Sequence, residues 1–334
     1  MKRQDKLRLL FHRDFDGICS AAVFLSYAKA SFLTEDAGVE LTPVDYEIKK
    51  SWSDLVLNEP TAILDFLFHP QAQWWYDHHD TAFVRTDWQL SFTTDQCHVW
   101  NTSYKSCPRL IVDSIEDNAL RQRLESRFSD YLLWCDIVDS ASYESAEQLM
   151  KCREPALQIN LSLATDRSVD YFNFLVHSFA ENSLEGVAAS PRVRECFLRA
   201  FSWQDKAVSH IKNTAEVGNR VAFIDLTERE GLFHRYAAFY IWPDLKFQIA
   251  AYKLGGQMKI TIGSNPWLPF AGPDLGDIAE DFGGGGHARV AGIALNSRKR
   301  AISVGQEIAK ILRGEVPYSR QLSFRHELIR QSHH

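Results

Sequence analysis

Three short apolar runs in the first 80 residues each end in side chains that bind divalent cations. The runs and their polar ends are residues 7–11 before His12, Asp14 and Asp16, residues 61–66 with Asp65, and residues 73–76 before Asp77, His78 and His79. Runs of this length predict buried strands of a parallel α/β sheet, in which ligands lie beyond the carboxyl ends of the strands. Imidazole and carboxylate both bind such cations, so the pattern predicts a metal site at one edge of a sheet.

In the remainder of the N-terminal half, the sequence predicts one more strand and several helices. Residues 18–25 predict a buried helix, and residues 39–46 predict another strand. From about residue 103, apolar residues recur every three to four positions, which indicates helices as far as about residue 215. One of these helices carries Asp136 and Asp139 in an apolar setting.

The C-terminal half predicts a second, smaller α/β domain. Strands are expected at residues 220–225, 237–242, 247–252 and 258–262, with helices at 275–282 and 299–313. We therefore expect three parts, namely a metal domain at residues 1–190, a helical connector at 191–215 and a substrate domain at 216–334.

Composition limits the classes of function. The chain of 334 residues has a net charge of −6, which argues against a broad basic groove for long duplex DNA. No stretch approaches the roughly 18 apolar residues of a membrane span, so no membrane partner is expected. The six cysteines are scattered without a CxxC pair, which favours reduced thiols and a cytoplasmic location.

In their order along the chain, these motifs resemble the DHH phosphoesterase superfamily, which includes RecJ-type exonucleases, short-oligonucleotide phosphodiesterases and manganese pyrophosphatases. The resemblance rests on His12-x-Asp14-x-Asp16-Gly17, Asp65, Asp77-His78-His79 and Asp136. A later run, Gly283 to His287 with Ala291-Gly292, resembles the DHH-associated C-terminal domain of the nuclease-like branch. Together the motifs reach from about residue 7 to residue 295.

The resemblance implies a role for each residue. One ion would be held by His12, Asp14 and Asp65, and the second by Asp16, Asp65, His78 and Asp136, with Asp139 as the alternative to Asp136. His79 would face the substrate phosphate as a catalytic residue, and Asp77 would orient the site. The mixed imidazole and carboxylate set favours two Mn²⁺ ions, with Mg²⁺ or Co²⁺ as alternatives.

The glycine-rich run indicates a substrate contact. Gly284, Gly285, Gly286, His287 and Arg289 are the expected residues, because glycines allow backbone N–H groups to approach a phosphate closely. Many nuclease-like relatives carry an arginine on the preceding strand, where this chain has Gly263. This difference predicts a different contact with the substrate.

The sequence thus predicts a manganese-dependent phosphoesterase that hydrolyses phosphodiester bonds by a two-metal mechanism. The expected substrate is a dinucleotide, a short single-stranded oligonucleotide or another nucleotide-derived phosphodiester. Two alternatives stay open at this point, a phosphatase acting on a small phosphorylated molecule and a non-catalytic nucleotide-binding protein that retains the fold. The oligomeric state is also open, with a homodimer among the alternatives.

Overall fold

The computed structural model describes residues 3–228 and 234–318. The chain divides into two compact units, one built from Met1–Tyr143 and Cys152–Ala200, the other from Glu144–Lys151 and Phe201–His334. Helix α9 (Pro191–Thr214) contributes residues to both units. The division into three parts at residues 190 and 215 stays a prediction. We refer to the two parts as unit 1 and unit 2.

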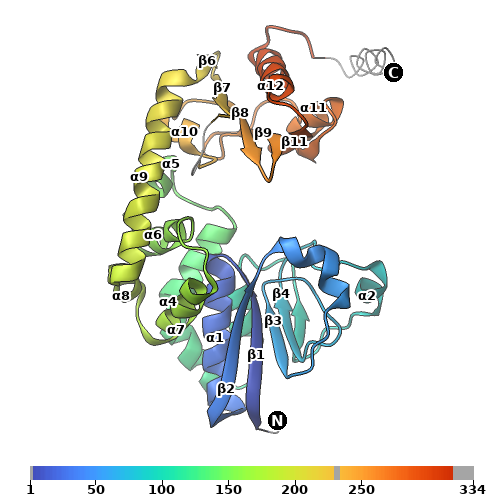
Figure 1. Ribbon diagram of the computed structural model, residues 1–334, viewed down its shortest axis with the longest axis vertical. Coiled ribbons are helices and arrows are strands. Elements are labelled where there is room, and N and C mark those ends of the chain that lie inside the picture. Colours follow the sequence, from blue (N-terminus) through green and yellow to red (C-terminus); the bar gives the residue numbers. More distant parts are fainter. Residues whose placement is uncertain (1–2, 229–233, 319–334) are drawn as a thin grey trace. The chain divides into compact units, whose positions relative to one another are not determined.

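Unit 1 is organised around a sheet of five parallel strands in the order β2-β1-β3-β4-β5 (Figure 1). The strands are β1 (Gln4–His12), β2 (Leu33–Val44), β3 (Thr61–Leu64), β4 (Trp74–Asp77) and β5 (His98–Trp100). The α/β class and the parallel sheet expected from the sequence are therefore confirmed. Because the strands are parallel, the polar residues that follow β1, β3 and β4 come out at the same edge.

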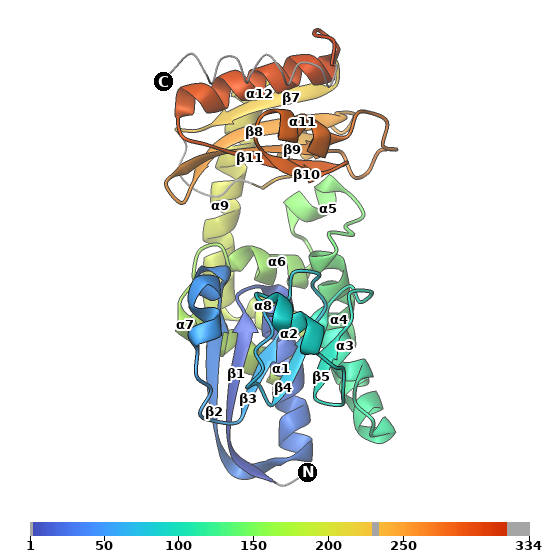
Figure 2. The same ribbon diagram turned by 90° about the vertical axis from the view of Figure 1, so that its right-hand side faces the viewer.

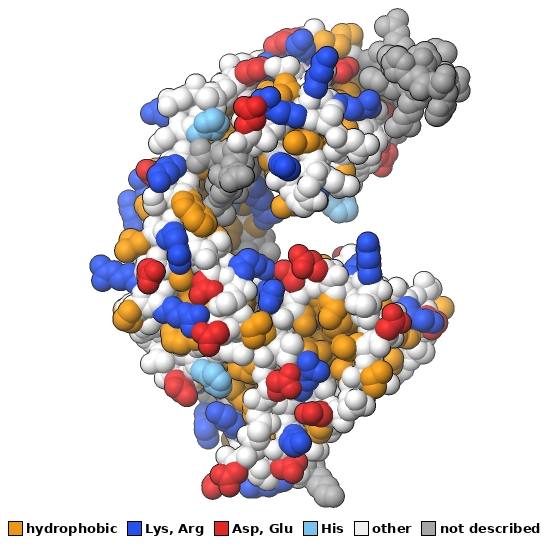
Figure 3. Space-filling model, viewed as in Figure 1, with side chains coloured by type: hydrophobic (Ala, Val, Ile, Leu, Met, Phe, Trp, Pro, Cys, Tyr) orange, Lys and Arg blue, Asp and Glu red, His pale blue; other side chains and the backbone are white. Residues whose placement is uncertain are grey.

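The sheet of unit 1 is buried on both faces, which explains its nearly continuous apolar runs. In β1, Leu9 and Phe11 face the larger core, while Leu10 points to the other side. The second face packs against an aromatic cluster that includes Trp52 and Trp75. In Figure 3, apolar side chains gather on the face of unit 1 over this region.

Helices supply the rest of unit 1, with α1 lying along the sheet in contact with α3, α4 and α7. The helices are α1 (Phe15–Ser31), α2 (Thr86–Ser91), α3 (Cys107–Asp113), α4 (Asn118–Asp139), α6 (Pro155–Ser162), α7 (Val169–Glu181) and α8 (Leu184–Ala189), with one 3-10 helix, η1 (Tyr46–Asp54). Among the described residues, no helix is both long enough and apolar enough to cross a membrane.

Unit 2 contains a six-stranded sheet in the order β10-β11-β9-β8-β7-β6, in which only the β7–β8 pair is parallel. Its strands are β6 (Glu216–Gly218), β7 (Val221–Leu226), β8 (Phe247–Leu254), β9 (Gln257–Ser264), β10 (Gly285–His287) and β11 (Val290–Leu295). Helices α11 (Leu275–Asp281) and α12 (Arg298–Arg313) cover one face (Figure 2). Helices α5 (Ala146–Lys151) and α10 (Ala237–Ile241) pack with α9 on the other.

One expectation about a single element was wrong, and another was confirmed only in part. The apolar run at residues 237–242 predicted a strand, but it forms the short helix α10, whose buried residues cover the sheet instead of joining it. The strand expected at residues 39–46 is β2, which begins at Leu33 and ends at Val44. The first half of β2 was not predicted as a strand because β2 lies at the edge of the sheet, where its polar residues remain exposed.

Candidate metal centre

The turn between β1 and α1 places three polar side chains at the end of the first strand. Asp14 caps helix α1, and its Oδ1 accepts a hydrogen bond of 2.8 Å from the N–H of Gly17. A side chain at Gly17 would place its Cβ 2.3 Å from the carbonyl oxygen of His12. Glycine at this position therefore allows the first turn of α1 to pack closely against the end of β1.

Asp65 directly follows strand β3 and is fully buried. Its backbone adopts a φ of 55°, in the left-handed region that aspartate and asparagine enter more readily than most residues. The Asp65 N–H donates a 2.9 Å hydrogen bond to the carbonyl of Tyr76 on the neighbouring strand. Neither of its carboxylate oxygens has a hydrogen-bond partner among the described residues. Such a conformation persists where the surroundings fix it, and it is frequent at functional sites.

Asp77 orients both histidines that follow it. Its Oδ1 accepts hydrogen bonds from the backbone N–H of His78 at 2.8 Å and from that of His79 at 3.2 Å. The same oxygen lies 2.8 Å from Nδ1 of His79. Asp77 is buried, so a single carboxylate fixes the backbone turn and the ring of His79 together.

The two histidine side chains have different surroundings. Nδ1 of His78 lies 3.0 Å from the carbonyl oxygen of Tyr104, a contact that directs Nε2 towards the carboxylates. The His78 side chain is 7% exposed, whereas that of His79 is 30% exposed. His78 therefore lies inside the cluster, and His79 lies at its accessible side.

These side chains converge on a common volume in unit 1. His78 Nε2 lies 3.5 Å from an oxygen of each of Asp16, Asp65 and Asp139. His12 Nδ1 lies 2.6 Å from Asp14 Oδ2 and 3.8 Å from Asp65 Oδ2. Three groups have ligand atoms within 4.8 Å of one another, namely Asp65 with His78 and His79, His12 with Asp14 and Asp65, and Asp16 with His78 and Asp139.

The donor set fits divalent cations. Five buried atoms in the cluster make no hydrogen bond of acceptable geometry to the described residues, and they are His12 Nδ1, Asp16 Oδ1, both oxygens of Asp65 and His78 Nε2. A polar atom buried without a partner is costly, and buried charges are normally paired or bound to metals. Such atoms facing one another are the arrangement expected of metal ligands.

Crowding of the carboxylates changes their acidity. Burial raises the pKa of Asp16 to about 7, and the negative charge of Asp65 adds to this effect. Burial likewise raises the pKa of Asp139 to about 7, with the charges of Asp16 and Asp14 contributing. Without a cation, these carboxyls therefore retain protons near neutral pH.

The pKa values of His12 and His78 are raised, whereas burial alone lowers the pKa of an imidazole. Burial lowers the pKa of His12, but the neighbouring Asp14 outweighs this effect and raises it to about 11. Burial also lowers the pKa of His78, but the carboxylates of Asp16 and Asp65, each 3.5 Å from Nε2, outweigh this effect and raise it to about 12. The cluster thus gathers positive charge from protons, which a bound divalent cation would replace.

Asp136, expected as a ligand, does not join this cluster. Its Oδ1 accepts a 2.6 Å hydrogen bond from Ser106, and its Oδ2 pairs with the Arg109 guanidinium at 2.7 Å. Asp139, at the end of the same helix α4, takes the position beside His78. The alternative residue is therefore the one the structure brings to the site, because Arg109 neutralises Asp136 one turn earlier.

The structure adds contacts that the sequence did not indicate. The backbone N–H of Cys107, in the first turn of α3, donates to Asp16 Oδ2 at 2.8 Å. Tyr46, the first residue of η1, packs edge-on against His12 with ring centres 5.2 Å apart. Backbone N–H and C=O groups are the same in nearly every residue type, so the sequence could not indicate the contacts made by the Cys107 N–H and the Tyr104 carbonyl.

The glycine-rich run of unit 2 forms a tight hairpin that begins after α11. The Gly283 and Gly284 N–H groups donate to carbonyls of α11, at 2.9 Å to Glu280 and at 2.8 Å to Ala279. Gly286 has a φ of 156°, and a Cβ there would lie 2.5 Å from Ala291. The backbone amides of Gly283 and Gly284 are thus already used to end the helix, and the glycines serve close packing of the hairpin.

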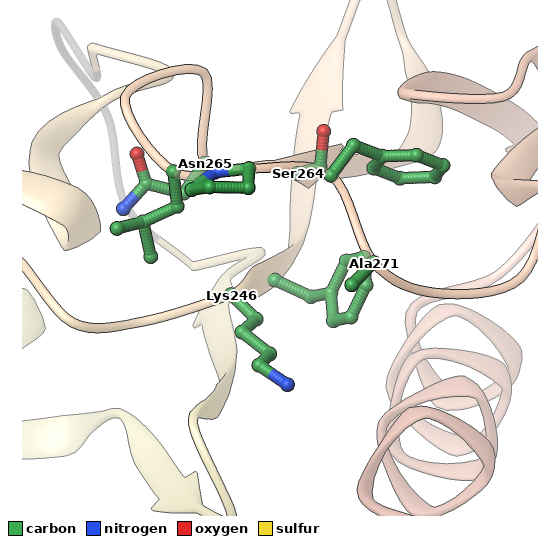
Figure 4. A pocket seen from close by; sticks show the side chains of 8 residues that line it. Lys246, Ser264, Asn265 and Ala271 are labelled. Carbon is green, nitrogen blue, oxygen red and sulfur yellow. The ribbon is translucent and has the colours of Figure 1, made fainter.

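The expected substrate contacts His287 and Arg289 are exposed on this hairpin. The Arg289 guanidinium lies 5.1 Å from the centre of the Phe270 ring. Phe270 lines a small hollow of about 10 Å³, the space of one water molecule. Lys246, directly before β8, and Ser264, the last residue of β9, also line it (Figure 4). Gly263, on β9, stands where an arginine was expected from the resemblance, and it pairs with Gln248 and Val290. A Cβ at this position would lie 3.9 Å from the Gln248 side chain, at ordinary contact distance.

Comparisons with known proteins agree with the fold. No protein-family model and no curated protein matches the sequence. Among solved structures, the pGpG-specific phosphodiesterase PggH from Vibrio cholerae gives a TM-score of 0.70 at 15% identity, covering 93% of this chain and 100% of PggH. RecJ from Thermus thermophilus in complex with Mn²⁺ gives a TM-score of 0.56 at 12% identity, covering 93% of this chain and 52% of RecJ.

A third solved structure is the DHH domain of a protein described as a member of a family of ribosomal proteins. It gives a TM-score of 0.54 at 12% identity, covering 91% of this chain and 87% of that one. The chain therefore has the fold of the DHH phosphoesterases, as the ordered motifs predicted.

Proposed function

We propose that the chain is a metal-dependent phosphodiesterase that hydrolyses short linear oligonucleotides, dinucleotides foremost. The observation that carries this proposal is the cluster of buried ligand atoms without hydrogen bonds at the carboxyl edge of the unit 1 sheet. Burying five polar ligand atoms without hydrogen bonds destabilises the fold unless these atoms bind a cation. The similarity in fold to PggH and RecJ supports the choice of a nucleotide phosphodiester as substrate.

The ligands divide into two sets that share one carboxylate. His12, Asp14 and Asp65 would hold one ion, and Asp16, Asp65, His78 and Asp139 would hold the other. Imidazole with carboxylate favours Mn²⁺, and solved structures of RecJ contain Mn²⁺ or Mg²⁺. When bound, divalent ions supply Lewis acidity and lower the pKa of water.

His79 is the residue that we assign to the substrate phosphate. Its Nδ1 is held by Asp77, which leaves Nε2 available at the accessible side of the cluster. Burial lowers the His79 pKa, but the bond to Asp77 and the charge of Asp65 raise it to about 9. A protonated imidazole in this position donates a hydrogen bond to a phosphate oxygen and carries positive charge towards the reacting group.

The net charge of −6 supports a short substrate. A long single strand needs several phosphate contacts, and each contact steepens the dependence of affinity on salt by roughly 0.7 in log–log slope. We therefore expect weak salt dependence and little gain in affinity beyond about two to four nucleotides. The roles of His287 and Arg289 as substrate contacts in unit 2 remain predictions.

The proposal is tested with a panel of substrates in the presence of Mn²⁺ or EDTA. The panel contains a linear dinucleotide, a cyclic dinucleotide, a decanucleotide, inorganic pyrophosphate and bis(p-nitrophenyl) phosphate. We expect Mn²⁺-dependent release of mononucleotides from the dinucleotide, with Asp65→Asn as the inactive control. Hydrolysis of pyrophosphate alone, or no dinucleotide hydrolysis with a loaded metal site, would overturn the proposal.

A further inference from the structure

Tyr46 presents an accessible aromatic ring beside the ligand cluster of unit 1. Strand β2 ends at Val44, which pairs with His12 on β1, and the chain reaches Tyr46 two residues later. The Tyr46 ring packs edge-on against the His12 ring, with the ring centres 5.2 Å apart. Tyr46 is 37% exposed, so part of this side chain is open to solvent next to an assigned metal ligand.

The surroundings of Tyr46 fix its ring in this position. Asp45 caps η1, because its Oδ1 accepts a 2.7 Å hydrogen bond from the Tyr46 N–H. The Tyr46 ring also contacts the buried ring of Phe66, the residue after Asp65, with ring centres 5.2 Å apart. His12 and Phe66 stack with ring centres 5.8 Å apart, so the three rings contact one another. A ring held in this way loses little conformational freedom when a ligand covers it.

The position of the Tyr46 ring suits the dimensions of a nucleotide. Tyr46 contacts the His12 ring, and His12 Nδ1 lies 2.6 Å from Asp14 Oδ2 and 3.8 Å from Asp65 Oδ2. The ring is thus separated from the carboxylates by one imidazole, and in a nucleotide the base is separated from its phosphate by one sugar. Every nucleobase has an aromatic face that can stack on a tyrosine ring. A phosphate at the cluster therefore allows its base to reach Tyr46.

We propose that the Tyr46 ring stacks against the base of the nucleotide whose phosphate occupies the ligand cluster. This inference rests on the proposed function, and it makes Tyr46 the residue that favours nucleotides over phosphodiesters without a base. Stacking strength depends on the aromatic surface of the base and not on its hydrogen-bonding groups, so purines should bind better than pyrimidines. The ring makes this contact, and the hydroxyl is not needed for it.

Removing the ring should lower the affinity for substrates that carry bases. Loss of one aromatic side chain that stacks on a base lowers affinity about 5- to 150-fold. Tyr46→Leu should therefore raise KM for the dinucleotide ApA by about this factor, with little change in kcat. Tyr46→Phe retains the ring and should keep a KM close to that of the wild type.

The kinetic experiment compares ApA with an analogue that lacks both bases and carries tetrahydrofuran residues in place of the nucleosides. The proteins are the wild type, Tyr46→Leu, Tyr46→Phe and Tyr27→Leu. Tyr27 is a matched control, because it is a half-buried tyrosine on α1 about 16 Å along the helix from Asp16. We expect Tyr46→Leu to lower kcat/KM for ApA and to leave that of the analogue unchanged, whereas Tyr27→Leu should change neither.

Equilibrium binding tests the same contact without turnover. Calorimetry compares AMP with ribose 5-phosphate on the manganese-loaded protein, since these two ligands share a sugar and a phosphate and differ in the base. AMP should bind more tightly to the wild type and to Tyr46→Phe. In Tyr46→Leu the ratio of the two affinities should fall at least about fivefold, while elemental analysis shows an unchanged manganese content.

Failure of this inference differs from failure of the proposed function. An unchanged ratio of affinities in Tyr46→Leu would overturn the stacking contact and leave the phosphodiesterase intact. An equal loss in Tyr46→Phe would also overturn it, because the hydroxyl would then make the contact, and so would loss of manganese in Tyr46→Leu, because the ring would then support His12. Absence of ApA hydrolysis by the wild type, with AMP still bound through Tyr46, would count against the phosphodiesterase alone.

Discussion

Replacing Asp65 by asparagine removes one negative charge from the centre of the ligand cluster while nearly preserving the shape of the side chain. Asparagine also tolerates the left-handed backbone at this position, where φ is 55°. Both oxygens of Asp65 are buried without a hydrogen bond from the described residues, and the residue belongs to two of the three ligand groups. The substitution should therefore weaken the binding of both ions at once.

The magnitude follows from the shared position of this carboxylate. Loss of a group that only orients a metal ligand costs about 10- to 100-fold in affinity, so loss of a shared ligand charge should cost at least as much. At a concentration of about 100 Kd, bound metal stabilises the fold by about 2.7 kcal/mol, and after a 100-fold loss of affinity by about 0.4 kcal/mol. The manganese-dependent rise in Tm should therefore shrink by roughly 5–9 °C for each ion.

Scanning calorimetry with Mn²⁺ or EDTA measures this rise, and elemental analysis counts the ions. Asp136→Asn is the matched control, because it makes the same chemical change on a carboxylate that pairs with Arg109 outside the cluster. In EDTA at neutral pH, Asp65→Asn should be at least as stable as the wild type. Burial raises the pKa of Asp65, and an acid whose pKa is raised by folding destabilises the folded state above its unfolded pKa. Wild-type metal content and an unchanged Tm rise in Asp65→Asn would refute the shared-ligand assignment.

Three further predictions concern the same cluster. Asp139→Asn should lower manganese affinity by about 10-fold or more while Asp136→Asn leaves it unchanged, and calorimetric titration showing the reverse order would restore Asp136 as the ligand. His78→Ala should lose metal, whereas His79→Ala should keep it and lose on the order of 10²–10⁴ in kcat, so equal metal loss in both variants would contradict the division of roles. Manganese affinity should rise with pH between about 6 and 8, because the carboxyls of Asp16 and Asp139, with pKa values of about 7, must lose protons before they bind a cation. A flat titration profile over this range would count against that linkage.

Much of the fold of unit 1 could be predicted because β3, β4 and the second half of β1 are short, apolar and largely buried. The polar residues that end β1, β3 and β4 then mark the site, since parallel strands present their carboxyl ends at one edge. The edge strand β2 was placed only in part, because its outer half carries exposed polar residues. In unit 2 the run at residues 237–242 has the composition of a strand, and tertiary packing makes it a helix.

The choice between Asp136 and Asp139 shows where sequence reasoning stops. The two carboxylates lie three residues apart on α4, so helical periodicity places them on similar faces. What separates them is Arg109, which comes from a different helix and neutralises Asp136. The orientation of His78 depends on the carbonyl of Tyr104, and any residue could supply that backbone group.

The dependence of kcat/KM on substrate length tests the proposed function most directly. The substrates are a dinucleotide, a trinucleotide, a pentanucleotide and a decanucleotide, each measured with Mn²⁺ and with EDTA at low and high salt. We expect the dinucleotide and trinucleotide to be the best substrates, with weak salt dependence and no hydrolysis in EDTA. A kcat/KM that rises steadily to the decanucleotide, or hydrolysis that survives EDTA, would contradict a metal-dependent phosphodiesterase specific for short oligonucleotides.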